Sequence, residues 1–251
     1  GWNRGDPLVS GPRAIIFDFN GVILDDEPVH CATMQEVLAE EGYRFTEEEY
    51  RCDYLALDDR GAFAAALRKM NRPVTEPVLA DLIRRKGIRY RARMRQEYRL
   101  FPGVADFLRA AARRVRLAIA SGAHRDEIEA ALARADLAAC FTAIVSADDV
   151  RRMKPDPEIY RTALDRLNRA SPRPAPPIPP SRCLAIEDSM AGVQAAQAAG
   201  MPCMAVTNSY PAEALGFADL VVPSLAGQTP GGLWRAATDG APGAGRKSKG
   251  R

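Results

Sequence analysis

Short apolar runs suited to strands alternate with amphipathic stretches suited to helices over most of the chain after residue 100. This alternation is typical of βαβ units and a parallel sheet, so we expect an α/β fold. Strands are expected at 115–120, 141–146, 183–187, 203–207 and 219–222, and helices at 104–113, 125–135, 158–168 and 189–199. A further apolar run, 14–17, is too short for a helix and predicts a buried strand near the start of the chain.

The part of the chain between this first strand and residue 101 carries only helical patterns. The motif Thr46-Glu-Glu-Glu49 predicts a capping box at the N-terminus of one helix. Because no strand pattern interrupts this part, we expect an all-helical domain inserted into an α/β core. The remaining helices are expected at 28–41, 60–70 and 76–98, the helical domain at 28–100, and the discontinuous core at 1–27 and 101–251.

Three segments have no periodic pattern. Residues 1–12 are polar with Gly and Pro, which predicts a loose leader. The chain from 227 onward is rich in Gly, Pro and basic residues, so we expect it to be disordered. Six prolines fall within 171–180, and since proline lacks an N–H donor and resists helix formation, this stretch should be a stiff, extended surface linker.

Composition narrows the class of protein. Hydrophobic residues make up 47% of the chain and charged residues 27%, as in ordinary globular proteins. There is no apolar run of membrane-spanning length and no signal-like segment at the start, so we expect a soluble cytoplasmic protein without membrane contact. The five cysteines are scattered and form no C-x-x-C pair, which favours reduced, buried thiols over disulfides or a zinc site.

The net charge is +3, and the stretch 84–99 alone contains eight basic residues. A nucleic-acid surface would need aromatic residues between the charges and a wider basic face. We therefore expect a solvated helix face that steers anionic substrates, and no nucleic-acid partner.

Reactive side chains stand at or soon after the ends of four expected strands. They are Asp18, Ser121 with Gly122, Lys154, and Glu187 with Asp188. The carboxyl ends of parallel strands meet at one edge of the sheet, where α/β proteins bind their ligands, so we expect these residues to come together. Taken alone, Ser121 is better explained as a helix N-cap, a role that is compatible with the functional one, and the alternative for Lys154 is a surface-loop residue.

Carboxylates, one hydroxyl and one lysine are the groups needed for phosphoryl transfer through an aspartyl phosphate. Asp18 is the expected nucleophile. A hard divalent cation held by Asp18, Asp188 and Glu187 would screen the repulsion between the phosphate and this nucleophile. Ser121 with nearby backbone amides would bind the transferring oxygens, and Lys154 would add a positive charge.

The same segments resemble the four motifs of the haloacid dehalogenase superfamily of phosphotransferases. The likeness covers roughly 13–225, and its most specific part is the last motif. The chain is most similar to the group with a helical cap after the first motif, which includes β-phosphoglucomutase and small sugar-phosphate and phosphoglycolate phosphatases. The motifs are Asp18-Phe-Asn-Gly-Val22, Ser121 after its strand, Lys154-Pro-Asp-Pro157, and Glu187-Asp-Ser-Met-Ala-Gly192 with the alanine-rich stretch that follows.

This resemblance implies a Rossmann-like parallel sheet flanked by helices, with a helical cap that closes over the site. It also implies Mg²⁺ bound by the side chains of Asp18 and Asp188, with Glu187 close by, and by the backbone carbonyl of Asn20. His30 matches the cap hinge, and Arg60 matches a cap arginine that grips a substrate phosphate in the mutases.

Asn20 departs from the family pattern, because phosphatases and mutases carry Asp at this position as the general acid and base. An amide cannot donate and recover a proton at neutral pH, so we expect a loss of about 10²- to 10⁴-fold in rate. Asp26 follows Asp25 where the hinge usually has Ser or Thr. Asp26 is either a substitute acid and base or simply the N-cap of the helix that begins near Pro28.

Three functions follow from these residues. The first is a Mg²⁺-dependent hydrolase of small phosphorylated substrates, acting as a monomer or weak dimer. The second is a mutase of the β-phosphoglucomutase type, against which Asn20 counts. The third is a phosphate-ester-binding or regulatory protein with little turnover. Dehalogenase chemistry would not need the paired Glu187 and Asp188, and for phosphonatase chemistry no lysine stands at a suitable place in the expected cap.

Overall fold

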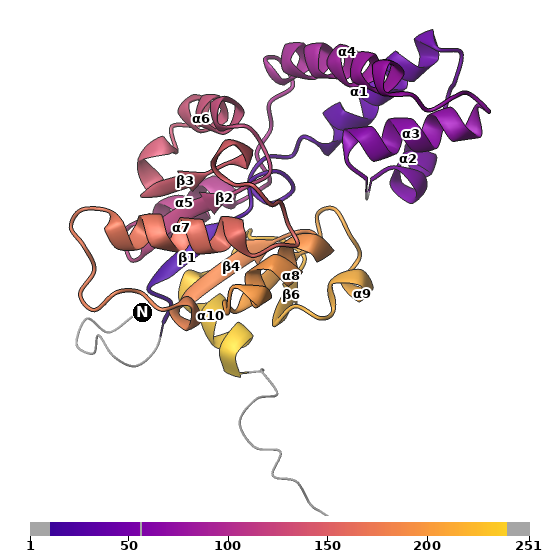
Figure 1. Cartoon of the computed structure of the whole chain (residues 1–251). Helices are drawn as coiled ribbons and strands as arrows, with labels where there is room; N and C mark the ends of the chain where they lie inside the picture. Colours follow the sequence, from indigo (N-terminus) through magenta and orange to yellow (C-terminus); the bar gives the residue numbers. More distant parts are fainter. Residues whose placement is uncertain (1–10, 56, 240–251) are drawn as a thin grey trace, which may run out of the picture. The chain divides into compact units, whose positions relative to one another are not determined.

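The computed structural model describes residues 11–55 and 57–239. The chain divides into two compact units: one joins the chain up to Asp25 with the chain from Leu100 onward, and the other is Asp26–Arg99. The first unit holds the sheet, and the second is helical (Figure 1).

A parallel sheet of six strands forms the centre of the first unit, in the order β3-β2-β1-β4-β5-β6. β1 lies between β2 and β4, and its residue Phe17 is level with Ile119 on one side and Ile186 on the other. The strands are β1 Ala14–Phe17, β2 Arg116–Ala120, β3 Ala143–Val145, β4 Cys183–Glu187, β5 Cys203–Val206 and β6 Leu220–Val222. The predicted α/β fold with a parallel sheet is confirmed, and every expected strand is present.

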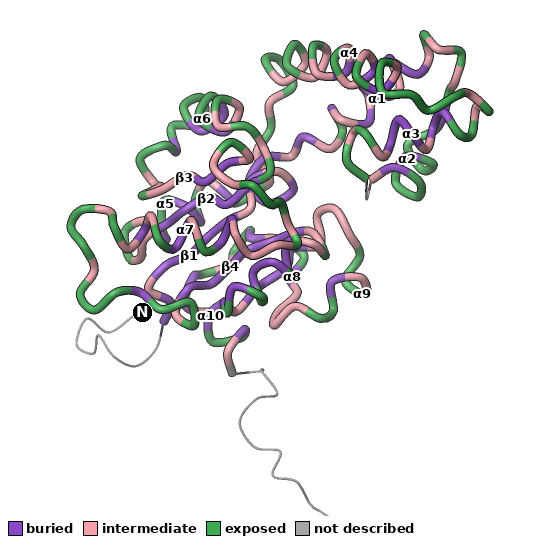
Figure 2. The backbone as a smooth tube through the Cα atoms, viewed as in Figure 1, coloured by how far each residue is buried: buried purple, intermediate pink, exposed green. Residues whose placement is uncertain are grey.

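Helices cover this sheet, and the side chains between the layers form the core of the unit. The central strands β1 and β4 are buried throughout (Figure 2). α7 contacts β2 and β3, and α8 contacts β4 and β5. The helices are α5 Val104–Ala112, α6 Arg125–Arg134, α7 Glu158–Arg169, α8 Met190–Ala198, α9 Ala212–Leu215 and α10 Pro230–Asp239, of which the sequence predicts the first four.

The second unit consists of α1 Glu27–Glu40, α2 Glu47–Asp53, α3 Asp59–Lys69 and α4 Glu76–Met94. The predicted capping box is confirmed, because the Thr46 hydroxyl accepts from the Glu49 N–H while the Glu49 carboxylate accepts from the Thr46 N–H. Aromatic side chains fill the core of this unit, namely Phe45, Tyr50, Tyr54 and Phe63. α4 ends at Met94 and is thus shorter than the 76–98 expected from its pattern.

The basic stretch of α4 is not a freely solvated face, which corrects the prediction. Arg85 lies 2.6 Å from Glu41, and Arg89 and Arg93 also pair with acidic residues of α1. Since α1 and α4 pack together, these opposite charges meet and neutralise one another. The acidic partners are Glu36 and Glu40 of α1 and Glu41, which directly follows this helix.

The predicted disorder from residue 227 onward is wrong for its first part. α10 buries Leu233, Trp234 and Ala237 and contacts β5 and β6. These three residues recur at the spacing of one helix face, a signal that the surrounding Gly and Pro obscure in the sequence. Residues 240–251 lie outside the described part of the chain.

The proline-rich stretch 171–180 is mostly exposed, but it is anchored to the core. Ile178 is only 3% exposed and belongs to the hydrophobic cluster beside the sheet. The Asn168 side chain donates to the Ile178 carbonyl and accepts from the Ile178 N–H, at 3.0 and 2.7 Å. Of the expected leader, Gly11 and Pro12 are buried, and residues 1–10 lie outside the described residues.

The cysteines only partly follow the prediction of buried thiols. Cys31, Cys183 and Cys203 are buried, whereas Cys52 is exposed and Cys140 is half-buried; all five are free thiols. Among the residues that the structure describes, no helix combines the length and the apolar composition needed to cross a membrane.

Substitution of Leu233 tests whether α10 contributes to the core. We expect Leu233→Ala to lower the free energy of unfolding by about 2–5 kcal/mol, because a nearly fully buried side chain is removed and leaves a cavity. Urea unfolding followed by circular dichroism measures this change. The matched control is the exposed Arg235→Ala on the same helix, for which we expect a change within about 0.5 kcal/mol. Equal stability of the two variants would contradict the packing of α10.

Candidate active site

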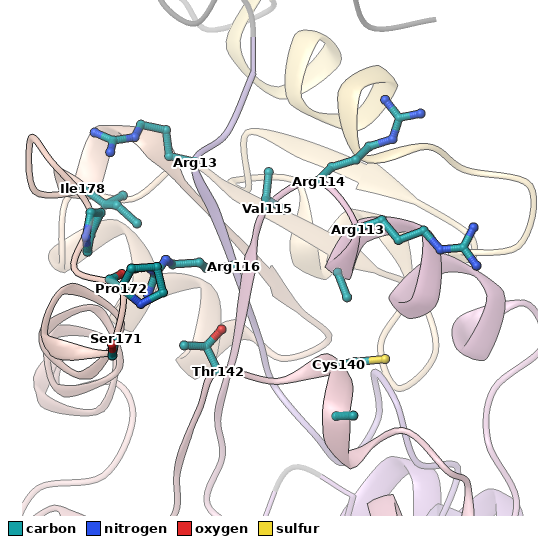
Figure 3. Close-up of a pocket in the computed structure, with 13 residues that line it drawn as sticks. Arg13, Arg113, Arg114, Val115, Arg116, Cys140, Thr142, Ser171, Pro172 and Ile178 are labelled. Atoms are coloured by element: carbon teal, nitrogen blue, oxygen red, sulfur yellow. The ribbon is translucent and has the colours of Figure 1, made fainter. Parts of the chain in front are cut away.

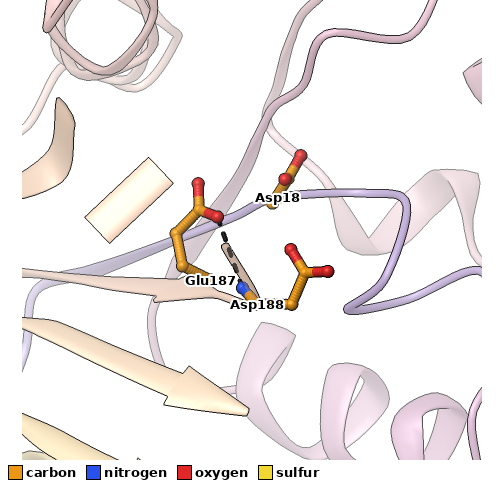
Figure 4. A group of neighbouring side chains, drawn as sticks. All are labelled: Asp18, Glu187 and Asp188. Atoms are coloured by element: carbon orange, nitrogen blue, oxygen red, sulfur yellow. Dashed lines mark hydrogen bonds between the residues drawn. The ribbon is translucent and has the colours of Figure 1, made fainter. Parts of the chain in front are cut away.

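Three carboxylates converge at the carboxyl ends of the two central strands. Asp18 directly follows β1, Glu187 is the last residue of β4, and Asp188 follows it. One oxygen from each residue lies within 4.8 Å of the others (Figure 4). The Asp18 side chain is 14% exposed, that of Glu187 is fully buried, and Asp188 is 6% exposed. The structure thus brings together the acidic residues that the strand ends predict.

Lys154 contacts two of these carboxylates. Its Nζ lies 3.0 Å from Asp18 Oδ2 and 2.6 Å from Glu187 Oε1, and its side chain is 10% exposed. Burial alone would lower the pKa of Lys154, but the negative charges of Asp18 and Glu187 raise it above its ordinary value. Lys154 therefore stays protonated, and it is not the ordinary surface residue that its loop position also allowed.

One ammonium group does not balance three carboxylates. Burial raises the pKa of Glu187 and that of Asp188, and the charge of Asp18 raises both further. Mg²⁺ prefers oxygen ligands, and carboxylates also supply negative charge that balances the charge of the ion. The donor set therefore fits a divalent cation.

Two glycines make room for the carboxylates. Gly21 has a φ of +75°, and a Cβ added there would lie 1.8 Å from Asp188 Oδ2. At Gly192, in the first turns of α8, an added Cβ would lie 1.9 Å from Glu187 Oε2. Neither distance is possible for a real side chain, so both positions require glycine while Glu187 and Asp188 keep these orientations.

Ser121 follows β2, one residue beyond the position level with Asp18. It is 1% exposed, and its Oγ accepts a hydrogen bond from the Ala123 N–H at 3.2 Å. The N-cap of α6 is His124, so the reading of Ser121 as a helix N-cap is wrong. Gly122 beside it is exposed.

Asn20 lies in the tight loop that joins β1 to the chain leading into α1. In this loop the Leu24 N–H donates to the Phe19 carbonyl and the Gly21 N–H donates to the Leu24 carbonyl, both at 3.0 Å. The Oδ1 atom of Asn20 is buried. The loop follows Asp18 directly, so the backbone of Asn20 lies next to this carboxylate in the chain, whatever the side chain at residue 20.

Three residues of the site escaped the sequence analysis. The Tyr160 hydroxyl on α7 donates to Glu187 Oε1, and the Ser209 hydroxyl donates to Asp188 Oδ2. Asn208 donates its side-chain amide to the Gly21 carbonyl at 2.7 Å. Asn208 and Ser209 lie in the loop after β5, so a search for polar residues after this strand, as after the others, would have found both. No sequence pattern identifies Tyr160 as a residue of the site.

Asp26 and His30 belong to the helical unit, where they form a buried network. Asp26 is 2% exposed; its Oδ2 accepts from the Tyr90 hydroxyl at 2.6 Å and lies 3.1 Å from His30 Nε2. The His30 ring stacks on Tyr90 with 4.5 Å between ring centroids. Asp26 occupies the N-cap position of α1, but its side chain makes no capping hydrogen bond.

The same network contains a lysine that the sequence analysis did not single out. Lys86 on α4 is 3% exposed, lies 2.8 Å from His30 Nδ1 and pairs with Asp59. Arg60 is more exposed, and its guanidinium forms two hydrogen bonds with the carboxylate of Glu76. A phosphate bound by Arg60 would therefore have to compete with Glu76.

Comparison with known proteins agrees with this geometry. Residues 12–200 match the family model of haloacid dehalogenase-like hydrolases. The protein CbbY of Rhodobacter capsulatus is 30% identical over 221 residues, which cover 85% of this chain and 93% of the relative. A phosphorylated carbohydrates phosphatase of Thermotoga maritima is 31% identical over 202 residues, which cover 75% of this chain and 82% of the relative.

A solved structure shows the same fold. The crystal structure of a CbbY mutant from Rhodobacter sphaeroides in complex with xylulose-1,5-bisphosphate superposes with a TM-score of 0.69 and 32% identity. The match covers 86% of this chain and 96% of that one. The family model spans most of this chain. The sheet of this chain carries the expected acidic cluster at the ends of its strands. The chain belongs to the haloacid dehalogenase-like hydrolases.

Proposed function

We propose that the protein is a Mg²⁺-dependent phosphatase of small phosphorylated metabolites that acts through a phosphoryl group on Asp18. The observation that carries this proposal is the buried group of Asp18, Glu187 and Asp188 with Lys154 bound between two of its members. Its relatives that are named phosphatases, and the relative crystallised with a sugar bisphosphate, support the same substrate class.

In the first step, a carboxylate oxygen of Asp18 attacks phosphorus and the bond from phosphorus to the leaving oxygen breaks. Lys154, whose Nζ already contacts Asp18, balances negative charge on the transferring group. Ser121 and Gly122 lie after the neighbouring strand and supply hydrogen bonds from that side. Mg²⁺ held by Asp18, Asp188, the nearby Glu187 and the backbone carbonyl of Asn20 would screen the repulsion between phosphate and nucleophile.

Asn20 limits this chemistry, because its amide cannot protonate the leaving oxygen or activate water. The backbone carbonyl that would bind Mg²⁺ is unaffected, because Asn differs from Asp only in its side chain. Substrates with good leaving groups, such as acyl phosphates, need no proton from the enzyme and should therefore react best. The same residue favours, as a second candidate, a phosphate-ester-binding protein with little turnover, and it counts against a β-phosphoglucomutase-like mutase.

The helical unit is proposed to act as a cap, with 28–100 as its extent, and to bind substrate through Arg60, His30 and Asp26. Arg60 offers a guanidinium held by the exposed Glu76, which a phosphate can displace in water. The buried network around Asp26 supports a positioning role for this carboxylate more than a role as substitute acid. We further propose a cytoplasmic monomer or weak dimer.

Asp18→Asn should abolish Mg²⁺-dependent phosphate release from a panel of phosphate monoesters and acyl phosphates, because an amide does not attack phosphorus. The exposed Asp106→Asn in the same unit is the matched control and should keep the rate of the natural chain. Chelation of the metal with EDTA should stop turnover as completely as the Asp18 substitution does. Turnover that persists in Asp18→Asn would show that Asp18 is not the nucleophile.

Asn20→Asp should raise kcat for phosphate monoesters by about 10²- to 10⁴-fold, because it restores a group that can give and take a proton. Mass spectrometry must accompany each assay, since deamidation of Asn20 before Gly21 would create the same Asp. One result would contradict the phosphatase proposal: the freshly prepared natural chain binds phosphate esters without hydrolysing them, while Asn20→Asp is active. The second candidate, a phosphate-ester-binding protein, would then take its place.

Asp26→Asn distinguishes a positioning residue from a substitute acid when it is introduced into both the natural chain and the Asn20→Asp variant. We expect kcat to fall by the same factor, within about threefold, in both backgrounds, because independent sites contribute additively. Steady-state rates on one acyl phosphate and one ester provide the comparison. A loss confined to the background with Asn20 would instead assign Asp26 the acid and base role.

A further inference from the structure

A pocket of about 500 Å³ opens at the end of the sheet opposite to the catalytic carboxylates. It lies where β1 and β2 begin: Arg13 directly precedes β1, and Arg116 is the first residue of β2. The connection from α5 to β2 forms one side of the pocket, and the start of the proline-rich stretch forms another (Figure 3). Since all strands are parallel, this amino-terminal end is separate from the site around Asp18.

The pocket has a strong positive charge. Four of its thirteen lining residues are arginines, namely Arg13, Arg113, Arg114 and Arg116, and none of the thirteen is acidic. The same lining includes the hydroxyls of Thr142 and Ser171, which can donate to an anion. Such a lining disfavours a cation and favours a ligand with several negative charges.

Two of the arginines hold the proline-rich stretch without losing their charge. Arg13 donates to the carbonyls of Pro176 and Pro177, at 2.8 and 3.3 Å. Arg116 donates to the carbonyl of Leu167 at 3.2 Å and also to that of Pro172. All these acceptors are neutral, and neither guanidinium group pairs with an acidic residue of 11–55 or 57–239, so within this part of the chain both keep their positive charge at the wall of the pocket.

The other two arginines are available to a ligand. Arg113 and Arg114 follow α5 and are exposed, and their guanidinium groups form no hydrogen bond or ion pair with any residue in 11–55 or 57–239. Figure 3 shows them on the opposite side of Val115 from Pro172.

We propose that this pocket binds a multiply charged phosphorylated small molecule, at a site separate from the catalytic one. A guanidinium group matches phosphate oxygens in a bidentate geometry, and Arg113 and Arg114, whose side chains extend in different directions in Figure 3, can each hold one phosphoryl group. The volume falls within the range of about 300–1,000 Å³ that is usual for small-molecule sites. Arg113 and Arg114 supply the contacts to the phosphates, and Arg13 and Arg116 supply a positive electrostatic potential around them.

Calorimetric titration with inorganic pyrophosphate in EDTA tests this site. Without a divalent cation, the three carboxylates around Asp18 repel a pyrophosphate, so the catalytic site does not contribute. We expect the natural chain to bind pyrophosphate and the double variant Arg113→Ala, Arg114→Ala to bind it about tenfold or more weakly. The control Arg235→Ala removes an exposed arginine elsewhere in the same unit and should leave the affinity unchanged.

Alkylation of Cys140 shows where the pyrophosphate lies. Cys140 lines the pocket, whereas Cys52 is exposed in the helical unit and serves as an internal reference. Bound pyrophosphate should slow the modification of Cys140 by iodoacetamide in the natural chain but not in the double variant, and should not affect Cys52. Four results would each overturn the proposal. They are equal affinity of the natural chain and the double variant, an equal loss of affinity in Arg235→Ala, no binding of pyrophosphate to the natural chain, and no protection of Cys140. None of these measurements depends on phosphatase activity.

Discussion

The contact of Lys154 with Asp18 and Glu187 is the interaction on which the candidate active site depends. Each buried charge costs several kcal/mol of desolvation unless an opposite charge lies close to it. Lys154 offsets part of this cost for two carboxylates at once, at 3.0 and 2.6 Å. With Asp188 added, negative charge remains in excess, and this excess makes the site suited to a divalent cation and, through that cation, to a phosphate.

The parallel sheet makes this arrangement possible. β1 and β4 are direct neighbours, and Phe17 pairs with Ile186, so the next residues, Asp18 and Glu187, come out side by side. Backbone space is as important as register, because a side chain at Gly21 or Gly192 would occupy the positions of the carboxylate oxygens. The glycines beside the acidic residues are thus part of the binding geometry.

Periodicity and strand-end chemistry predict the sheet, the helices α5 to α8 beside it and most of the candidate site, because both depend on local sequence. The sequence did not reveal contacts between elements distant along the chain. Tyr160 reaches Glu187 from a helix whose pattern indicates only a buried face. Similarly, the sequence of α4 predicts a solvated basic face, because it does not reveal that Glu40 at the end of α1 and Glu41 after it pair with this face. The apolar residues of α10 were hidden by the surrounding Gly and Pro.

The effect of Asn20 on the reaction rate should depend on the substrate, because only some leaving groups need a proton. An alcohol leaves an ester readily only if its oxygen is protonated, and the amide of Asn20 cannot do this. A carboxylate leaving an acyl phosphate needs no proton, and the phosphorylated Asp18 is itself an acyl phosphate, so attack by water on it also expels a stable carboxylate. Departure of the leaving group from an acyl phosphate therefore needs no acid, whereas for every substrate water must attack phosphorylated Asp18 without a base at residue 20. Under the proposed function, Asn20 therefore selects substrates at the step in which the leaving group departs.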